Sequence, residues 1–204
     1  MRKLVCLAVL FFIVPFALFS QNLSNLEFIS PFHDGVAAIK KGERWAFVNN
    51  QGELVVDFRN DFVLSNINKK EYPIFNSDRC LIHKKKDGIL YYGYIDKKGN
   101  EVIEPEFLNA TPFTNGLAIV LKLYKDVLGT NDVLDKKMID YNYMEVAIDM
   151  NGDIVHYFTE KPVHITLSRD FLRKPPLIKT KFIAENLIAT MNKDKTWSIK
   201  KYKL

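Results

Sequence analysis

Four histidines are the side chains of this sequence that could most readily bind a metal ion or transfer a proton. They are His33, His83, His156 and His164. None has a partner at a metal-binding spacing such as His-x-x-x-His, which places two imidazoles on one face of an element. His33 also occupies a loop position that holds Asn76 or Thr114 in similar stretches of the chain. We therefore expect the histidines to be structural or solvent-facing, with no metal site.

The segment from Asp149 to Asp153 faintly resembles a calcium loop. A hand-type loop alternates its oxygen ligands, places glycine sixth and ends on a bidentate glutamate. Here Gly152 is fourth, and the matching segment Asn49–Gly52 has the sequence Asn-Asn-Gln-Gly. A hairpin turn explains this segment better than a metal site does.

Motifs for nucleophilic catalysis and for nucleotide binding are missing from the sequence. The chain has no Gly-x-Ser-x-Gly elbow, no Gly-x-Gly-x-x-Gly and no phosphate loop. Catalytic groups can still converge from distant positions, so a small extracytoplasmic hydrolase remains an alternative. We expect no catalytic residue, no cofactor-binding residue and no cofactor.

Aromatic residues make up 13% of the chain and give the one hint of a ligand-facing surface. Trp45, Tyr92 and Trp197 recur at equivalent positions, so we expect them to fill the core. Four further tyrosines alternate with these residues or lie in an insertion, and some of them could be exposed: Tyr91, Tyr94, Tyr141 and Tyr143. An exposed aromatic stripe on a β surface could bind sugar rings or a peptide.

The first twenty residues have the layout of a secretory signal peptide. Arg2 and Lys3 form a positive segment, Leu4–Phe19 is an apolar run, and Ser20 offers a small residue at a cleavage point. The run is shorter than the roughly 20 apolar residues that span a bilayer. We expect cleavage, one mature domain over residues 21–204, and a secreted or periplasmic location. An uncleaved N-terminal membrane anchor is the alternative.

Charge and cysteine content argue against a nucleic-acid partner and against an internal disulfide. Removal of Arg2 and Lys3 lowers the Lys+Arg count from 29 to 27 against 24 Asp+Glu, so the net charge falls from +5 to +3. The charges are scattered, and the densest run, Lys84–Lys86, suits a solvated hairpin turn, so we expect no nucleic-acid partner. Cys80 is the single cysteine after residue 20 and cannot form an internal disulfide.

Three segments of the chain share one hairpin pattern: Trp45–Gly52, Tyr92–Gly99 and Glu145–Gly152. Each has an alternating apolar run, then Asn or Asp, two variable residues, glycine, and a second β-branched run. This pattern predicts a β-hairpin whose glycine has a left-handed conformation, because a Cβ at positive φ is strained. The Asn or Asp can accept hydrogen bonds from the turn amides.

A second element precedes each hairpin, and together they predict the fold. Pro31–Ile39 matches Pro112–Val120, and a weaker copy, Phe75–Ile82, has Cys80 at an alanine position, which predicts a small buried residue. Each repeat is then a three-stranded meander of roughly forty residues, a period typical of propellers and solenoids. We expect an all-β domain of such meanders in a propeller-like or solenoid array. The expected repeats cover about residues 28–58, 72–107, 112–158 and, in degenerate form, 182–204.

We expect the mature chain to begin on the last strand of one repeat and to end in the middle of another. The last copy places Trp197 where the first has Trp45 and stops before a third strand. A terminal strand around Trp197 could therefore pair with the strand around Phe28 and cover both open edges. Two segments interrupt the pattern: Tyr124–Tyr143 predicts a lengthened hairpin, with a short helix as the alternative, and in the linker His156–Lys181 the run Val163–Leu167 could form an extra strand.

These residues resemble the WG-repeat family, also called KWG repeats. The family pattern is roughly Pro-Phe-x-x-Gly-Leu-Ala-x-Val, a turn, Trp-Gly-Tyr-Ile-Asp-x-x-Gly, then apolar residues, proline and an aromatic. Gly93–Val120 follows it throughout. Trp45-Ala46 lacks the glycine, Tyr92-Gly93 lacks the tryptophan, and Glu145-Val146 lacks both. The resemblance covers about residues 28–155, and it implies short β modules, mostly in bacterial proteins and often behind signal peptides, with no shared catalytic residues.

We expect a secreted or periplasmic binding module without catalysis. Recognition would use the inter-repeat loops, above all Tyr124–Tyr143, because variable loops on a rigid scaffold are where contacts usually evolve. The expected partner is a protein or a surface glycan, and a membrane only if the N-terminal segment is uncleaved. A hydrolase or carbohydrate-binding protein and a cell-surface structural spacer are the alternatives.

Overall fold

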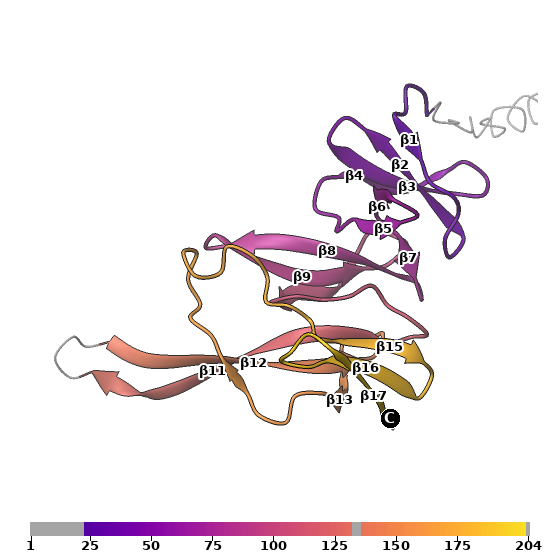
Figure 1. Cartoon of the computed structure of the whole chain (residues 1–204). Helices are drawn as coiled ribbons and strands as arrows, with labels where there is room; N and C mark the ends of the chain where they lie inside the picture. The colour runs from indigo at the N-terminus through magenta and orange to yellow at the C-terminus, as the bar shows by residue number, and fades with distance from the viewer. Residues whose placement is uncertain (1–22, 132–135, 203–204) are drawn as a thin grey trace, which may run out of the picture.

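The computed structural model describes residues 23–131 and 136–202, and its elements are all β-strands (Figure 1). The prediction of an all-β fold is confirmed. None of the described residues forms a helix that could cross a membrane. The expected signal peptide, residues 1–20, lies outside the described residues.

Four antiparallel sheets follow one another along the chain. Sheet 1 contains β1 (Phe28–Ile29), β2 (Val36–Lys41), β3 (Arg44–Asn49) and β4 (Leu54–Arg59). Sheet 2 contains β7 (Phe75–Asn76), β8 (Arg79–Lys86), β9 (Ile89–Ile95) and β10 (Glu101–Phe107). Sheet 3 contains β11 (Ala118–Asn131), β12 (Lys136–Ile148) and β13 (Ile154–Tyr157), and β14 (Val163–His164) also pairs with β12. Sheet 4 contains β15 (Thr180–Ala184), β16 (Leu187–Met191) and β17 (Trp197–Lys201), and a ribbon of β5 (Ser65–Ile67) and β6 (Lys70–Tyr72) joins sheets 1 and 2.

The same glycine turn closes the hairpin in sheets 1, 2 and 3. Gly52, Gly99 and Gly152 have φ values of 79°, 82° and 91°, and each glycine amide donates to the carbonyl three residues earlier over 3.0 Å. The side chain at that earlier position, as in Asp96, also accepts two amides of the turn. The predicted left-handed glycine is thus confirmed in all three copies. Sheet 4 forms the equivalent turn with Lys195 at a φ of 67°.

Gly93, the glycine of the Trp-Gly pair in the family pattern, is required by a bulge in β10. Tyr94 pairs with Ile103 and Tyr92 pairs with Phe107, so three residues of β10 lie opposite the single Gly93. A Cβ at Gly93 would lie 2.5 Å from the carbonyl oxygen of Ile103. Real Cβ atoms do not approach backbone so closely, so a side chain is excluded here.

The equivalent positions in sheets 1 and 3 hold larger residues, and the bulge in the facing strand is shorter there. Two residues of β4 lie opposite Ala46, because its neighbours Trp45 and Phe47 pair with Arg59 and Val56. Val146 pairs regularly with Tyr157 and has no bulge over it. The side chain therefore grows from Gly to Ala to Val as the bulge in the facing strand shrinks.

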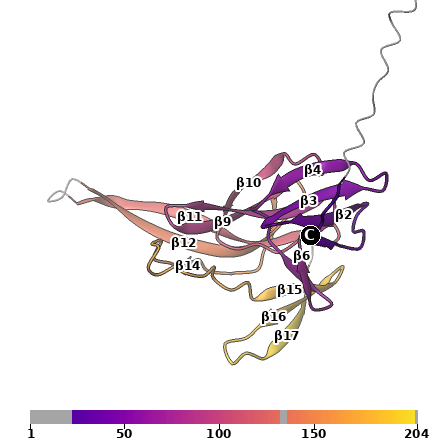
Figure 2. The same cartoon turned by 90° about the horizontal axis from the view of Figure 1, so that it is seen from above.

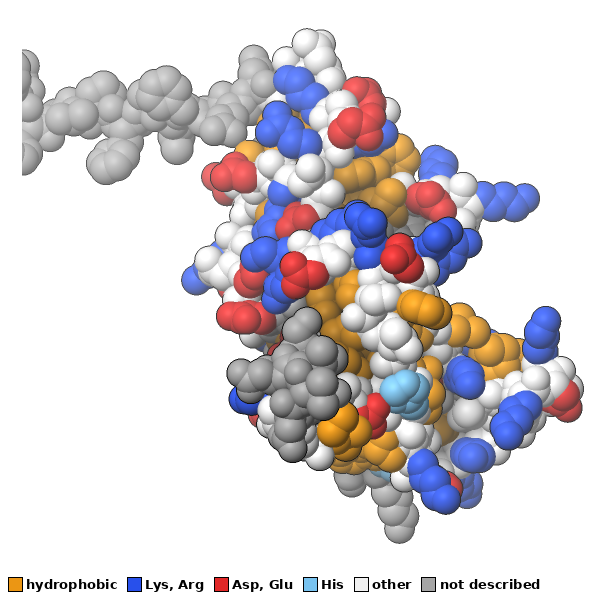
Figure 3. Space-filling view, turned by 90° about the vertical axis from the view of Figure 1, so that its left-hand side faces the viewer, with side chains coloured by type: hydrophobic (Ala, Val, Ile, Leu, Met, Phe, Trp, Pro, Cys, Tyr) orange, Lys and Arg blue, Asp and Glu red, His pale blue; other side chains and the backbone are white. Residues whose placement is uncertain are grey.

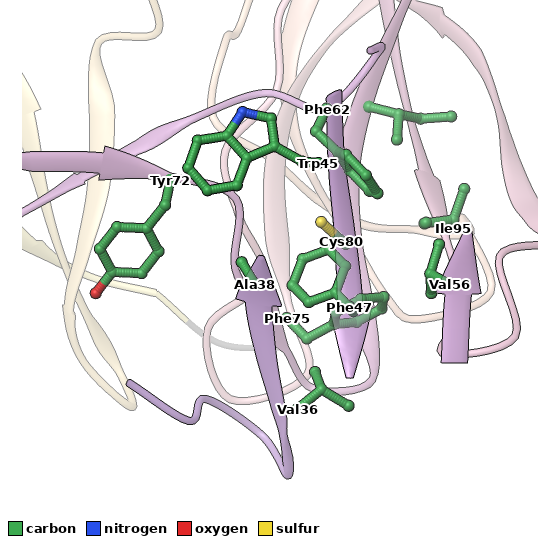
Figure 4. Close-up of a cluster of buried hydrophobic side chains, with 11 residues drawn as sticks. Val36, Ala38, Trp45, Phe47, Val56, Phe62, Tyr72, Phe75, Cys80 and Ile95 are labelled. Atoms are coloured by element: carbon green, nitrogen blue, oxygen red, sulfur yellow. The ribbon is translucent and has the colours of Figure 1, made fainter. Parts of the chain in front are cut away.

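Consecutive sheets pack through apolar cores, and aromatic residues join them. Phe75 of sheet 2 is fully buried against Phe47 of sheet 1, with ring centroids 4.7 Å apart (Figure 4). Phe113, just before sheet 3, packs in the same way on Tyr94 of sheet 2, also at 4.7 Å. Cys80 lies in the first of these cores and is 1% exposed, which confirms the prediction of a small buried residue.

Sheet 4 is attached to sheet 3 by a buried carboxylate. Glu145 stands where sheet 1 has Trp45 and sheet 2 has Tyr92, and it is 6% exposed. Its two carboxylate oxygens accept the amides of Lys179 at 3.1 Å and Thr180 at 2.6 Å. Loss of the aromatic residue in this copy is therefore explained by a different way of holding the next sheet.

The array has two separate ends. The hypothesis that the strands around Trp197 and Phe28 pair is wrong, because β17 pairs with β16 and β1 pairs with β2. Each of these strands pairs along one edge with its own sheet, and sheet 4 lies to one side of sheet 3 (Figure 2). Leu23 and Leu26 pack on the outer face of sheet 1.

The insertion forms a β-arm that projects from sheet 3 (Figure 1). β11 and β12 pair from Ala118 and Ile148 out to Asn131 and Lys136. The predicted lengthened hairpin is confirmed, and the alternative of a short helix is wrong. Of the expected linker strand Val163–Leu167, only β14 forms, next to Asn142 and Tyr143 of β12.

Candidate binding surfaces

The four histidines lie apart from one another. His33 Nε2 is 3.1 Å from the Tyr72 hydroxyl, and His164 Nδ1 is 2.8 Å from an Asp140 carboxylate oxygen. His156 packs against Phe158, with ring centroids 4.9 Å apart. Within residues 23–131 and 136–202, no three His, Cys, Asp or Glu side chains come together as a metal site would require.

The aromatic residues are not arranged as the sequence suggested. Trp45 and Tyr92 are buried as expected, but the expectation for Trp197 is wrong, because its side chain is 49% exposed. No sheet covers it, since sheet 4 is the last of the described array. Tyr94 is fully buried, while Tyr91 and Tyr143 pack under the linker, so these residues do not form an open stripe.

Three hairpin tips form a hydrogen-bonded row along one side of the array, which we call the turn row. The tips are Asp34-Gly35, Ser77-Asp78 and Asn115-Gly116, and both central residues of each have positive φ, as a type I′ turn requires. The Asp34 carboxylate accepts the Asp78 amide at 2.6 Å, and the Ser77 hydroxyl accepts the Gly116 amide at 3.0 Å. Lys97 also pairs with Asp34 at 3.4 Å and Asp78 at 2.5 Å.

Beyond the third tip, the turn row gives way to a pocket of about 520 Å³ between sheets 3 and 4. Its apolar wall includes Leu117, Phe182 and Tyr202, and its polar rim includes Asn115 and Glu185. Burial raises the pKa of Tyr202, and the nearby Glu185 carboxylate raises it further.

A second pocket of about 350 Å³ continues this one toward the β5–β6 ribbon. The two pockets share Thr114 and Phe182, and the second adds Asn66, Asn76 and Lys181. We call the pair the inter-repeat groove, and Figure 3 shows the surface hollowed where sheet 4 stands below the earlier elements. It joins amide and hydroxyl groups to an apolar wall, which suits a peptide or a sugar.

The groove is better suited to binding than to acid–base hydrolysis. Glu185 is the one carboxylate among the residues that line its two pockets. A glycosidase needs two carboxyl groups that face each other across the scissile bond. The groove offers one carboxylate at its rim, and Lys181 as the single cation.

The outer half of the β-arm is the most exposed apolar segment of the insertion. Val127, Leu128, Met138 and Ile139 are between 37% and 69% exposed. Residues 108–111 cover the edge of β11 only as far as Leu121, and β14 covers β12 only at Asn142 and Tyr143. Farther out, the described part of the arm is a two-stranded ribbon with both edges open.

A shielded hydroxyl lies at the inner end of the arm. The Tyr124 hydroxyl is buried and has no hydrogen-bond partner among the described residues. Burial, with a smaller contribution from the neighbouring Tyr157 hydroxyl, raises the pKa of Tyr124 to about 12. This tyrosine is therefore neutral at physiological pH.

Sequence reasoning predicted the arm but missed the groove. The groove combines Asn115 with Phe182 and Tyr202, which are distant in sequence, and no local pattern reveals such a meeting. The one available signal was the Asn115-Gly116 pair, which is typical of a type I′ turn at the end of a hairpin.

Comparison with known proteins agrees with this architecture. The family described as "WG containing repeat" matches residues 25–45, which cover β1 and β2, and residues 92–125, which run from β9 into β11. The second match ends inside the third copy, at residue 125, and the fourth copy is not matched. No curated protein and no solved structure matches the chain. The second matched segment contains the Gly99 turn and the Gly93 bulge described above, and these two segments are similar to WG-containing repeats.

Proposed function

We propose that this WG-repeat protein is an exported, non-catalytic binding module whose β-arm contacts a protein partner. The observation that carries the proposal is the open outer half of the arm, where apolar side chains and two unpaired strand edges are exposed together. Unpaired edges can add a strand from another chain, and exposed apolar residues can supply the side-chain contacts. Export is proposed from Arg2, Lys3 and Leu4–Phe19.

The test is to shorten the arm without disturbing the sheet. Replacing Val127–Ile139 by Asn-Gly would close the hairpin on the pair Asp126–Asp140 with a two-residue type I′ turn. Capture from an envelope extract should lose a specific protein with this variant, and with Leu128→Lys in the intact arm. Phe171→Ser is the matched control, because Phe171 is 78% exposed but lies in the linker. Equal capture by the wild type and both arm variants would reject the proposal.

Export has its own test. The mature protein should begin at Gln21 and be recovered from the periplasm or the medium. N-terminal sequencing of the purified protein measures this directly, and a start at Met1 in the membrane fraction would favour the uncleaved anchor instead.

A surface glycan is the second candidate partner, and the inter-repeat groove favours it. Phe182 and Tyr202 offer aromatic surface, while Asn115 and Glu185 offer hydrogen-bonding groups on its rim. Glu185→Ala and Asn115→Ala should then weaken binding to envelope glycans on an array, and shortening the arm should leave that binding unchanged. A glycan that binds both groove variants as tightly as the wild type would exclude this candidate.

A further inference from the structure

The two ends of the array present complementary apolar surfaces. In sheets 1 and 2, the face directed toward the next sheet carries Trp45 with Phe47, or Tyr92 with Tyr94, and these residues are at most 8% exposed. In sheet 4 the equivalent residues are Trp197 and Ile199. They are 49% and 68% exposed. A capping repeat usually has a polar outer face, so sheet 4, the last sheet of the described residues, does not look like a cap.

Within the chain, a phenylalanine from the following repeat covers each of these aromatic faces. Phe75 covers Phe47, and Phe113 covers Tyr94, each with ring centroids 4.7 Å apart and each fully buried. The equivalent residue of the first copy is Phe32, and no sheet precedes it within residues 23–202 as the structure describes them. Its side chain is 54% exposed.

A second exposed residue extends the surface at that end. Ile29 of β1 is 62% exposed and lies close to Phe32 in the chain. The rest of the outer face of sheet 1 is covered by Leu23 and Leu26, and Ala46 beneath them is fully buried. Contact at this end is thus limited to Phe32 and Ile29, which predicts a weak and concentration-dependent association.

We infer that a second copy of this chain docks head to tail, with Phe32 of one molecule on the Trp197–Ile199 face of the next. The intramolecular pairs Phe75–Phe47 and Phe113–Tyr94 supply the geometry of this contact. The inference does not depend on the β-arm or on export.

Charge disfavours contact between two copies of sheet 4. Residues 179–202 contain six lysines against two acidic residues, so two copies of sheet 4 repel each other. Residues 23–59 contain five acidic and four basic residues and present no such barrier. Two different surfaces that meet form a heterologous contact, which builds open chains of molecules rather than a closed dimer.

The test uses two variants that each remove one end. We call the Phe32 surface the head and the Trp197–Ile199 face the tail. Phe32→Ser removes the apolar anchor of the head, and Ile199→Ser removes apolar surface from the tail. Both side chains are exposed in the single molecule, so neither substitution should unfold it, and circular dichroism checks this. Phe171→Ser is the control for loss of an exposed phenylalanine. The full chain is purified in the form in which the cell leaves it and is studied by sedimentation over a wide concentration range.

Wild type and Phe171→Ser should form progressively larger species as concentration rises. Each end variant alone should associate at least about tenfold more weakly, because a truncated apolar anchor typically costs that much affinity. A mixture of the two variants should form a heterodimer and nothing larger, since one intact head and one intact tail remain. A wild type that stays monomeric, a Phe32→Ser variant that associates normally, or a mixture that stays monomeric would each overturn the inference.

Discussion

Gly93→Ala is the substitution that tests the structural account most directly. The added Cβ would lie 2.5 Å from the Ile103 carbonyl oxygen, 2.6 Å from the Pro105 nitrogen and 2.7 Å from the Glu104 carbonyl carbon. All three are backbone atoms, so no side chain can rotate away, and β10 itself must move. Overpacking of this kind costs roughly 1–3 kcal/mol, and three simultaneous backbone contacts place this case near about 3 kcal/mol.

Alanine also stiffens the unfolded chain, which returns about 0.4–1 kcal/mol. We therefore expect Gly93→Ala to lower the free energy of unfolding by about 2–3 kcal/mol. For a domain of this size that corresponds to a fall in Tm of roughly 4–10 °C. Urea denaturation followed by tryptophan fluorescence measures the first quantity, and calorimetry measures the second.

A deletion tests whether the bulge is the cause. Removing Pro105 leaves two residues of β10 opposite residue 93, which is the arrangement that accommodates Ala46 in sheet 1. In that background Gly93→Ala should cost less than about 1 kcal/mol, as expected when the overpacking is relieved. The reasoning is refuted if Gly93→Ala is neutral in the natural chain, or if its cost is unchanged by the deletion.

Other residues give simpler tests. Lys195→Gly should stabilise the protein by about 1 kcal/mol in urea denaturation, because lysine at a φ of 67° is strained; a loss of stability would contradict this. Glu145→Gln should keep sheet 4 attached, whereas Glu145→Ala should loosen it, because only the ring contacts of His156 and Phe158 with Phe182 and Tyr202 then remain; limited proteolysis of the linker would detect this, and equal cleavage would count against the carboxylate anchor. Burial opposes ionisation of Asp96, but hydrogen bonds from Asn100 and the turn amides outweigh burial and lower the pKa of this carboxyl group. The ionised side chain therefore stabilises the fold above its ordinary pKa of about 4, and this stabilisation is lost as the pH falls through the lower pKa of the folded protein. Asp96→Asn should flatten that part of the stability-versus-pH curve, and an unchanged curve would be inconsistent with this role. Burial strongly raises the pKa of the Cys80 thiol, so alkylation should follow unfolding and be slow in the native protein, whereas rapid native labelling would contradict its burial.

The repeated hairpins were predictable because their signal is local. Glycine at positive φ, preceded by Asn or Asp, specifies the turn within five residues, and the turns at Gly52, Gly99 and Gly152 share one geometry. The arm was predictable for a similar reason, since Gly129 and its polar neighbours interrupt two runs that could pair.

Features that depend on a distant neighbour were not predictable. Trp197 matches Trp45 in sequence, but burial requires a following sheet, and sheet 4 has none. Ala46 and Val146 stand where the family pattern has glycine, and the reason becomes clear only from the number of residues that bulge opposite them in the facing strand. The expected pairing of the chain ends failed because sheet 4 is held beside sheet 3 by Glu145.

The turn row connects sheets 1, 2 and 3 but not sheet 4, so these two parts of the molecule should differ in stability. Hydrogen bonds from tip to tip hold sheets 1, 2 and 3 together, whereas among the described residues no such bond reaches Glu185-Asn186, the tip of sheet 4. That sheet is joined through Glu145 and through the rings of His156 and Phe158, which pack on Phe182 and Tyr202. We expect sheet 4 to open while sheets 1, 2 and 3 stay folded. Amide hydrogen exchange should show β16 losing protection before β3 and β9, and each opening would widen the inter-repeat groove.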